Sequence, residues 1–94
     1  MNLEVLKEVY KVIEDRKNNP KPSSYVSTLM AKGFESVLAK IEEESEELID
    51  AAKNKNSSEI IHEAVDLMFH MFILLVFKNI KFEEILREFK RRRK

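Results

Sequence analysis

Apolar side chains recur along this chain at the three- and four-residue spacing that places them on one face of a helix. The expected helices span residues 3–17, 25–32, 34–53, a long stretch from the Asn56 cap to about residue 78, and a stretch from Phe82 into the basic tail. No segment shows the convincing alternation of apolar and polar residues that marks a half-buried strand. We therefore expect an all-α protein.

Proline, glycine and serine separate the first helices. Pro20 and Pro22 end the first one, because proline lacks the amide donor that a helix needs. Ser23 or Ser24 is expected to cap the second helix, and Gly33 is expected to close it as a left-handed C-cap.

The second half of the chain has two further breaks. Residues 54–58 are polar and predict a loop, and residues 79–81 predict a turn. Asn56 followed by Glu59 resembles a capping box at the start of the long fourth helix.

The segment 68–77 is apolar nearly all round and needs packing partners on more than one side. A chain of 94 residues forms one domain, here 1–94, with few helices to cover that segment. We therefore expect a bundle of four to five helices whose core is completed by a homodimer.

Composition excludes several classes of site and location. Zero cysteines exclude disulfides and thiolate chemistry, and a single glycine excludes a glycine-rich phosphate loop. The apolar run 68–77 contains His70 and is shorter than the roughly 20 residues of a membrane span. Residues 1–10 include Glu4 and Glu8 and do not resemble a signal peptide. A soluble, cytoplasmic protein without a membrane partner is expected.

Charge is balanced overall, with 17 basic and 17 acidic residues, but it is segregated along the chain. Residues 35–66 carry ten acids against three lysines, whereas residues 87–94 carry six bases against Glu88. Overall neutrality argues against nucleic acid as a partner, since that function favours a positive surface. The Arg91–Lys94 tail is a phosphate clamp, a nucleic-acid patch or a solvated helix end that complements the helix dipole.

Acidic residues fall on the core-facing stripes of the third and fourth expected helices. At about 100° per residue, one stripe holds Lys40, Glu44, Glu47 and Ala51, with Glu43 at its edge. The other stripe holds Glu59, Glu63, Asp66 and His70. An ionised carboxylate in such a position costs several kcal/mol to bury unless a positive charge neutralises it.

Two interpretations of these stripes remain open. The acids form a solvated or ion-paired face, for which only Lys40 is suitably placed, or they bind a metal ion. Four carboxylates would converge if the two helices packed side by side: Glu44, Glu47, Glu63 and Asp66. Mg²⁺ or Mn²⁺ prefers such oxygen ligands. His70 is a metal ligand, a phosphate contact or a buried histidine bonded to a neighbour, and His62 is expected to be exposed.

The two acidic motifs, Glu43-Glu44-x-x-Glu47 and Glu63-x-x-Asp66, resemble the signature of the MazG-type all-α nucleotide pyrophosphohydrolases. Within that superfamily the chain is most similar to the phosphoribosyl-ATP pyrophosphatases, from about residue 3 to residue 93. The further matches are Arg16, Pro20 or Pro22, Ser24-Tyr25, Leu29 to Gly33, Asp66 to His70, and Arg91 to Arg93. One departure is Glu42, where the family commonly has glycine; glutamate is the better helix former.

The resemblance implies a MazG-like helical bundle that dimerises and an Mg²⁺-dependent enzyme. The reaction would be hydrolysis of 1-(5-phosphoribosyl)-ATP to 1-(5-phosphoribosyl)-AMP and pyrophosphate, the second step of histidine biosynthesis. The family's metal-binding acids correspond to Glu43, Glu44, Glu47, Glu63 and Asp66.

Roles for individual residues follow from that reaction. Glu44 or Glu47 is the candidate acceptor of the proton from the attacking water. Arg16 and Lys40 are candidate phosphate contacts; their other interpretations are a helix-terminal cation and an ion-pair partner. Tyr25 is a candidate contact for the ribose or the base, or a packing residue, and His70 completes the candidate substrate-binding set.

Two rival functions remain. A MazG-type enzyme that removes stray nucleoside or deoxynucleoside triphosphates would use the same acids. A non-catalytic helical module would bind a partner through its basic end, and changing Glu47 or Asp66 would leave its function intact.

Overall fold

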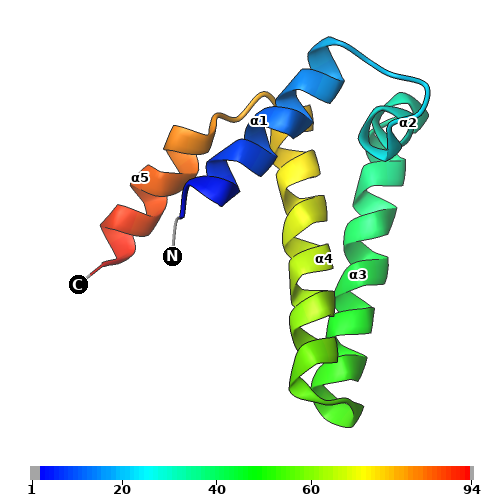
Figure 1. Cartoon of the computed structure of the whole chain (residues 1–94), viewed down its shortest axis with the longest axis vertical. Helices are drawn as coiled ribbons and strands as arrows, with labels where there is room; N and C mark the ends of the chain where they lie inside the picture. The colour runs from blue at the N-terminus through cyan, green and yellow to red at the C-terminus, as the bar shows by residue number, and fades with distance from the viewer. Residues whose placement is uncertain (1–2, 94) are drawn as a thin grey trace.

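The computed structural model describes residues 3–93, which form five helices joined by short connections (Figure 1). They are α1 (Glu4–Asn18), α2 (Tyr25–Lys32), α3 (Phe34–Asn54), α4 (Ser57–Phe77) and α5 (Phe82–Arg92). No strand occurs among residues 3–93, so the all-α prediction is confirmed. The helix bounds agree with the expected ones to within one residue.

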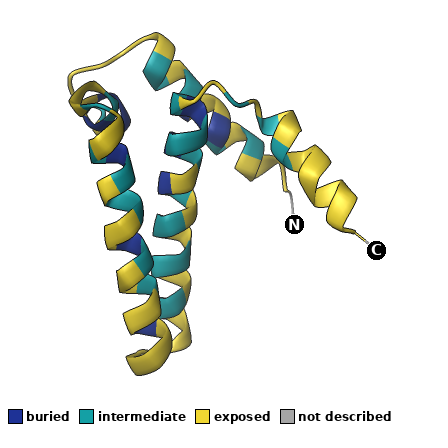
Figure 2. Ribbon diagram, turned by 180° about the vertical axis from the view of Figure 1, so that it is seen from behind, coloured by how far each residue is buried: buried dark blue, intermediate teal, exposed yellow. Residues whose placement is uncertain are grey.

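A long hairpin of α3 and α4 dominates the fold (Figure 1). The two helices have 21 residues each, run in opposite directions and make the most extensive helix–helix contact. α1 and α2 pack against one end of this hairpin, whereas α5 extends away from it (Figures 1 and 2). None of the described helices therefore covers the other end of the hairpin.

The core lies where α1 and α2 meet the hairpin. Its fully buried large side chains are Tyr10, Ile13, Val37 and Ile73. The ring of Tyr10 contacts Phe72 at a centroid distance of 5.1 Å and Phe82 at 5.3 Å. These contacts attach α1 and the start of α5 to the covered end of α4.

Side-chain caps explain where two helices begin. Ser24, one of the two predicted candidates, accepts a hydrogen bond from the Ser27 amide at 3.2 Å. Asn56 accepts one from the Glu59 amide at 3.1 Å, which confirms the predicted cap. Within residues 3–93 no return bond joins the Glu59 carboxylate to Asn56, so the capping box forms only by half.

The predicted left-handed C-cap at Gly33 is wrong in one angle. Gly33 has φ 104° and ψ 174°, so its φ is positive but its ψ is extended. The reason is that Gly33 is the only residue between α2 and α3, and the chain must change direction there at once. Only glycine adopts this backbone conformation without strain.

α4 exposes much of its apolar surface. Ile61, Val65, Met68 and Met71 are all exposed in the single chain. Among the described helices, α4 alone is long and apolar enough to cross a membrane by length and composition. In this fold α1, α2 and α3 all pack against α4, although only 17% of its apolar stretch is buried.

Candidate metal centre and nucleotide site

Two groups of potential metal ligands lie on the hairpin. Glu43, Glu44 and Glu47 form the α3 group, and His62, Glu63 and Asp66 form the α4 group. Within each group, one ligand atom per residue lies within 4.8 Å of the others. The five acids predicted from the sequence all belong to these groups. His62 is exposed, as expected, yet its Nε2 lies 3.4 Å from a carboxylate oxygen of Asp66.

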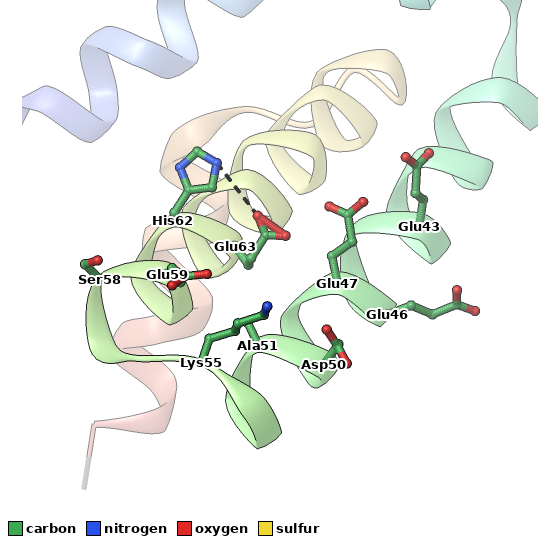
Figure 3. A pocket seen from close by; sticks show the side chains of 10 residues that line it. All are labelled: Glu43, Glu46, Glu47, Asp50, Ala51, Lys55, Ser58, Glu59, His62 and Glu63. Carbon is green, nitrogen blue, oxygen red and sulfur yellow. Dashed lines mark ion pairs between the residues drawn. The ribbon is translucent and has the colours of Figure 1, made fainter.

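A cleft of about 720 Å³ lies between α3 and α4, towards the uncovered end of the hairpin. Its lining is Glu43, Glu46, Glu47, Asp50, Ala51, Lys55, Ser58, Glu59, His62 and Glu63 (Figure 3). Figure 3 shows Glu47 and Glu63 on facing helices, whereas Glu46 points away from Glu63. The cleft therefore brings residues of both acidic motifs together.

Glu44 is the buried member of the α3 group, with 6% of its area exposed. Its Oε1 lies 3.4 Å from Nζ of Lys40, while its Oε2 has no hydrogen-bond partner among residues 3–93. Burial and the nearby carboxylate of Glu47 raise the pKa of Glu44, against the opposing effect of Lys40. A buried carboxylate oxygen without a partner is the feature that an added cation would satisfy.

The donor set is chemically suited to a hard divalent ion. The α3 group consists of carboxylates alone, and the α4 group adds two more carboxylates and one imidazole. Mg²⁺ and Mn²⁺ prefer oxygen ligands of this type. The residues present therefore fit the cation that the sequence motifs predict.

Lys40 provides positive charge beside the α3 group. Its Nζ lies 3.2 Å from a carboxylate oxygen of Glu43 and 3.4 Å from one of Glu44. Burial lowers the pKa of Lys40, but these two carboxylates and the Tyr25 hydroxyl outweigh that effect and the pKa is raised. The ion-pair interpretation of Lys40 is confirmed, and its contact with phosphate stays a prediction.

His70 is the buried, hydrogen-bonded histidine that was one of its three interpretations. Only 6% of its surface is exposed. Its Nδ1 lies 2.7 Å from the carbonyl oxygen of Asp66, and its Nε2 lies 2.7 Å from the hydroxyl of Tyr25. Both ring nitrogens are thus engaged by protein atoms.

Tyr25 connects α2 to the acidic site. Half of its surface is exposed, and its ring packs edge-on against His70 at 5.6 Å. Burial of the hydroxyl raises the pKa of Tyr25; Lys40 lowers it and Glu44 raises it further. The hydroxyl therefore lies within electrostatic reach of the α3 acids.

Arg16 is not brought to the acidic cleft. Its guanidinium pairs with Asp15 at 2.7 Å, and it lines a separate hollow of about 290 Å³ with Ser27 and Phe77. This position at the end of α1 matches the helix-terminal interpretation. A contact between Arg16 and a phosphate remains a prediction.

The basic tail also lies apart from the cleft lining. Arg91 and Arg92 both pair with Glu88, and both are exposed at the end of α5. This is the solvated helix end that complements the helix dipole. Lys94, the last residue of the predicted cluster, is outside the described residues.

Sequence reasoning gave no site role to several residues of the cleft, chiefly Asp50, Lys55 and Glu59, although it placed Glu59 on the acidic stripe of the fourth helix. Helical spacing gave a signal for two of them, because Asp50 follows Glu47 by three positions and Glu59 precedes Glu63 by four. Lys55 gave no such signal. It lies in the hairpin turn, and only the fold directs it to the cleft (Figure 3).

Comparison with known proteins identifies the family of this chain. The family model described as phosphoribosyl-ATP pyrophosphohydrolase matches residues 6–93. A phosphoribosyl-ATP pyrophosphatase of Methanocella arvoryzae is 56% identical over 97% of this chain and 98% of its own length. The enzyme of the same name from Clostridium novyi is 45% identical over 99% of this chain and 84% of its own. The chain is therefore a hydrolase that belongs to the phosphoribosyl-ATP pyrophosphohydrolase family.

Proposed function

We propose that this chain hydrolyses 1-(5-phosphoribosyl)-ATP to 1-(5-phosphoribosyl)-AMP and pyrophosphate in histidine biosynthesis, with Mg²⁺ as its cofactor. The relatives' names supply the substrate class. The observation that carries the chemistry is Glu44 of the α3 group, whose buried Oε2 has no hydrogen-bond partner within the residues that the structure describes. An acidic cleft of this kind repels a polyphosphate unless cations accompany it.

Five carboxylates would hold the metal: Glu43, Glu44, Glu47, Glu63 and Asp66. Bound Mg²⁺, or Mn²⁺ in its place, would neutralise phosphate charge and lower the pKa of a coordinated water. His62, beside Asp66, is placed to orient that carboxylate rather than to replace it as a ligand.

Glu47 is the better placed of the two candidate proton acceptors. Its carboxylate is exposed and lines the cleft, so it can reach a water molecule there. Glu44 is buried and does not line the cleft, which suits a fixed ligand. Lys40, held by Glu43 and Glu44, supplies a positive charge toward the substrate phosphates.

A homodimer would complete the fold. The exposed apolar residues of α4, together with the exposed Ile49 of α3, offer apolar surface to a second copy. A second copy on this surface would bury the exposed apolar side chains of α4 against protein rather than lipid. We expect a soluble enzyme that works in the cytoplasm.

The test is hydrolysis by the purified protein with Mg²⁺, comparing phosphoribosyl-ATP with ATP and dCTP. We expect phosphoribosyl-ATP to be preferred and pyrophosphate to be the second product. Preference for ATP or dCTP would instead assign the chain to triphosphate removal. Absence of Mg²⁺-dependent hydrolysis of all three would favour a non-catalytic helical module.

A further inference from the structure

Tyr25 and His70 form a hydrogen-bonded pair that links α2 to α4 beside the acidic site. The hydroxyl of Tyr25 lies 2.7 Å from Nε2 of His70, although the residues are 45 positions apart. On the other side of the ring, Nδ1 of His70 lies 2.7 Å from the carbonyl oxygen of Asp66. The imidazole therefore bridges a candidate metal ligand's backbone and a half-exposed phenol.

The chemistry of these partners assigns the protons. A carbonyl oxygen can only accept, so Nδ1 of His70 carries the hydrogen that bonds to Asp66. In a neutral imidazole the other nitrogen is then an acceptor. While the imidazole of His70 is neutral, the Tyr25 hydroxyl therefore donates to Nε2, and its only proton points inward.

The outward side of the Tyr25 oxygen consequently has lone pairs and no proton. An oxygen of this kind accepts a hydrogen bond from a donor and cannot donate to a phosphate oxygen. A nucleotide offers two kinds of neutral donor, the sugar hydroxyls and the amino group of the base. Since the sugar is the part joined to the α-phosphate, it is the part nearest to acids that bind the phosphates through a metal.

We propose that His70 is a positioning residue that fixes the Tyr25 hydroxyl as a hydrogen-bond acceptor for a ribose hydroxyl of the substrate. Neither ring nitrogen of His70 is available to touch substrate or metal itself. Tyr25 would make the contact. His70 would fix the orientation of the Tyr25 hydroxyl by accepting its proton in a hydrogen bond. This assignment rests on the proposed nucleotide hydrolysis, but the proton positions do not.

Two variants test the pair through its effect on substrate binding. Tyr25→Phe removes the oxygen and keeps the ring, and His70→Phe removes the acceptor that orients it. We expect each to raise KM for phosphoribosyl-ATP by about 3- to 10-fold, with kcat changed by less than about twofold. The double variant is expected to resemble the single ones, because both break the same interaction.

His70→Gln and Thr28→Ala make the matching rescue and control. The amide oxygen of glutamine can accept from Tyr25, so we expect part of the KM loss to be restored. Thr28→Ala removes another exposed hydroxyl of α2, one that bonds only to the Ser24 carbonyl, and KM is expected to stay unchanged. Multiplying effects in the double variant, or an unchanged KM in His70→Phe, would overturn the proposal.

The ligand and the proton positions are tested separately. Substrates lacking one ribose hydroxyl are expected to bind the wild type more weakly, with Tyr25→Phe no longer discriminating against one of them. Nitrogen-15 NMR of the protein without substrate is expected to show the Nδ1–H tautomer of His70. An Nε2–H tautomer or an imidazolium at neutral pH would overturn the assignment. Failure of the proposed function would appear differently, as no hydrolysis of phosphoribosyl-ATP by the wild type.

Discussion

Nζ of Lys40 lies 3.4 Å from one carboxylate oxygen of Glu44, while the other oxygen of Glu44 is buried and finds no hydrogen-bond partner in the described part of the chain. One lysine, shared with Glu43, thus leaves half of a buried carboxylate unsatisfied. Burial and Glu47 raise the pKa of Glu44 as a result. The fold keeps a locally unfavourable charge at the place where the proposed function requires a cation.

This relationship predicts that Glu44→Gln separates stability from activity. A carboxyl group whose pKa is raised on folding contributes stability below its ordinary pKa of 4.5, and this is lost as the pH rises through the folded value. At pH 7 and without metal, the free energy of unfolding of the variant should therefore be about 1 kcal/mol higher than that of the wild type. Its Mg²⁺-dependent hydrolysis should be lost. Denaturant unfolding measures the first effect and pyrophosphate release the second.

Glu42→Gln is the control for that substitution, since Glu42 is exposed on the same helix. It should change the free energy of unfolding by no more than about 0.5 kcal/mol and leave hydrolysis intact. A Glu44→Gln variant that is less stable than the wild type without metal would show that Lys40 already satisfies this carboxylate.

The environment of Tyr10 predicts how the free energy of unfolding depends on alkaline pH. Its hydroxyl donates to the Ile80 carbonyl at 2.6 Å, and burial, followed by Glu14, Glu84 and Glu83, raises its pKa to about 12. Tyr10→Phe leaves that carbonyl unpaired and should lower the free energy of unfolding by about 1–3 kcal/mol at pH 7.

The sign of the pH effect follows from the raised pKa. The contribution of Tyr10 is fully present below its ordinary pKa of 10.0 and is lost as the pH rises toward about 12. The difference in stability between wild type and Tyr10→Phe should therefore narrow over this range in unfolding experiments. A constant difference would mean that the hydroxyl keeps its ordinary pKa in the folded protein.

Gly33→Ala tests the junction between α2 and α3. A Cβ at this position would meet nothing within 4 Å, so the substitution probes only the backbone, which has φ 104°. We expect a loss of about 1–3 kcal/mol in the free energy of unfolding. Lys32→Ala, at the neighbouring exposed position, should cost no more than about 0.5 kcal/mol. Equal effects would indicate that the junction relaxes without strain.

Val65→Asp tests the proposed dimer surface. Val65 of α4 is 53% exposed and Val12 of α1 is 51% exposed, so the same substitution can be compared at two equally accessible positions. An aspartate in an apolar interface should shift the protein to monomers in sedimentation experiments, whereas Val12→Asp should remain dimeric. A dimer that tolerates Val65→Asp but not Val12→Asp would place the interface on α1.

The helices were predictable because their signals are local. Apolar spacing set their faces, and Ser24 and Asn56 marked two of their starts with caps that the structure contains. The acids were predictable for the same reason, since carboxylates on a core-facing stripe conflict with burial. Spacing did not distinguish Glu44, which is buried, from Glu47, which is exposed nearer the uncovered end of the hairpin.

Features that depend on distant parts of the chain could not be predicted. The Tyr25–His70 pair joins residues 45 positions apart, and only the packing of α2 on the hairpin creates it. The position of Arg16 outside the cleft lining likewise depends on how α1 packs against the hairpin. Local patterns placed these residues on helices but not beside their partners.

We propose that carboxylates of the facing helices α3 and α4 act together in Mg²⁺-dependent hydrolysis. The most direct test of this cooperation is the rate of pyrophosphate release from phosphoribosyl-ATP, measured across Mg²⁺ concentrations for Glu47→Gln, Asp66→Asn and the control Glu46→Gln. Glu46 is also acidic and lines the cleft, but it points away from Glu63 (Figure 3). We predict a loss of about 100-fold or more for Glu47→Gln and Asp66→Asn, and a nearly wild-type rate for Glu46→Gln. Wild-type rates in either Glu47→Gln or Asp66→Asn would contradict the joint role of the α3 and α4 carboxylates.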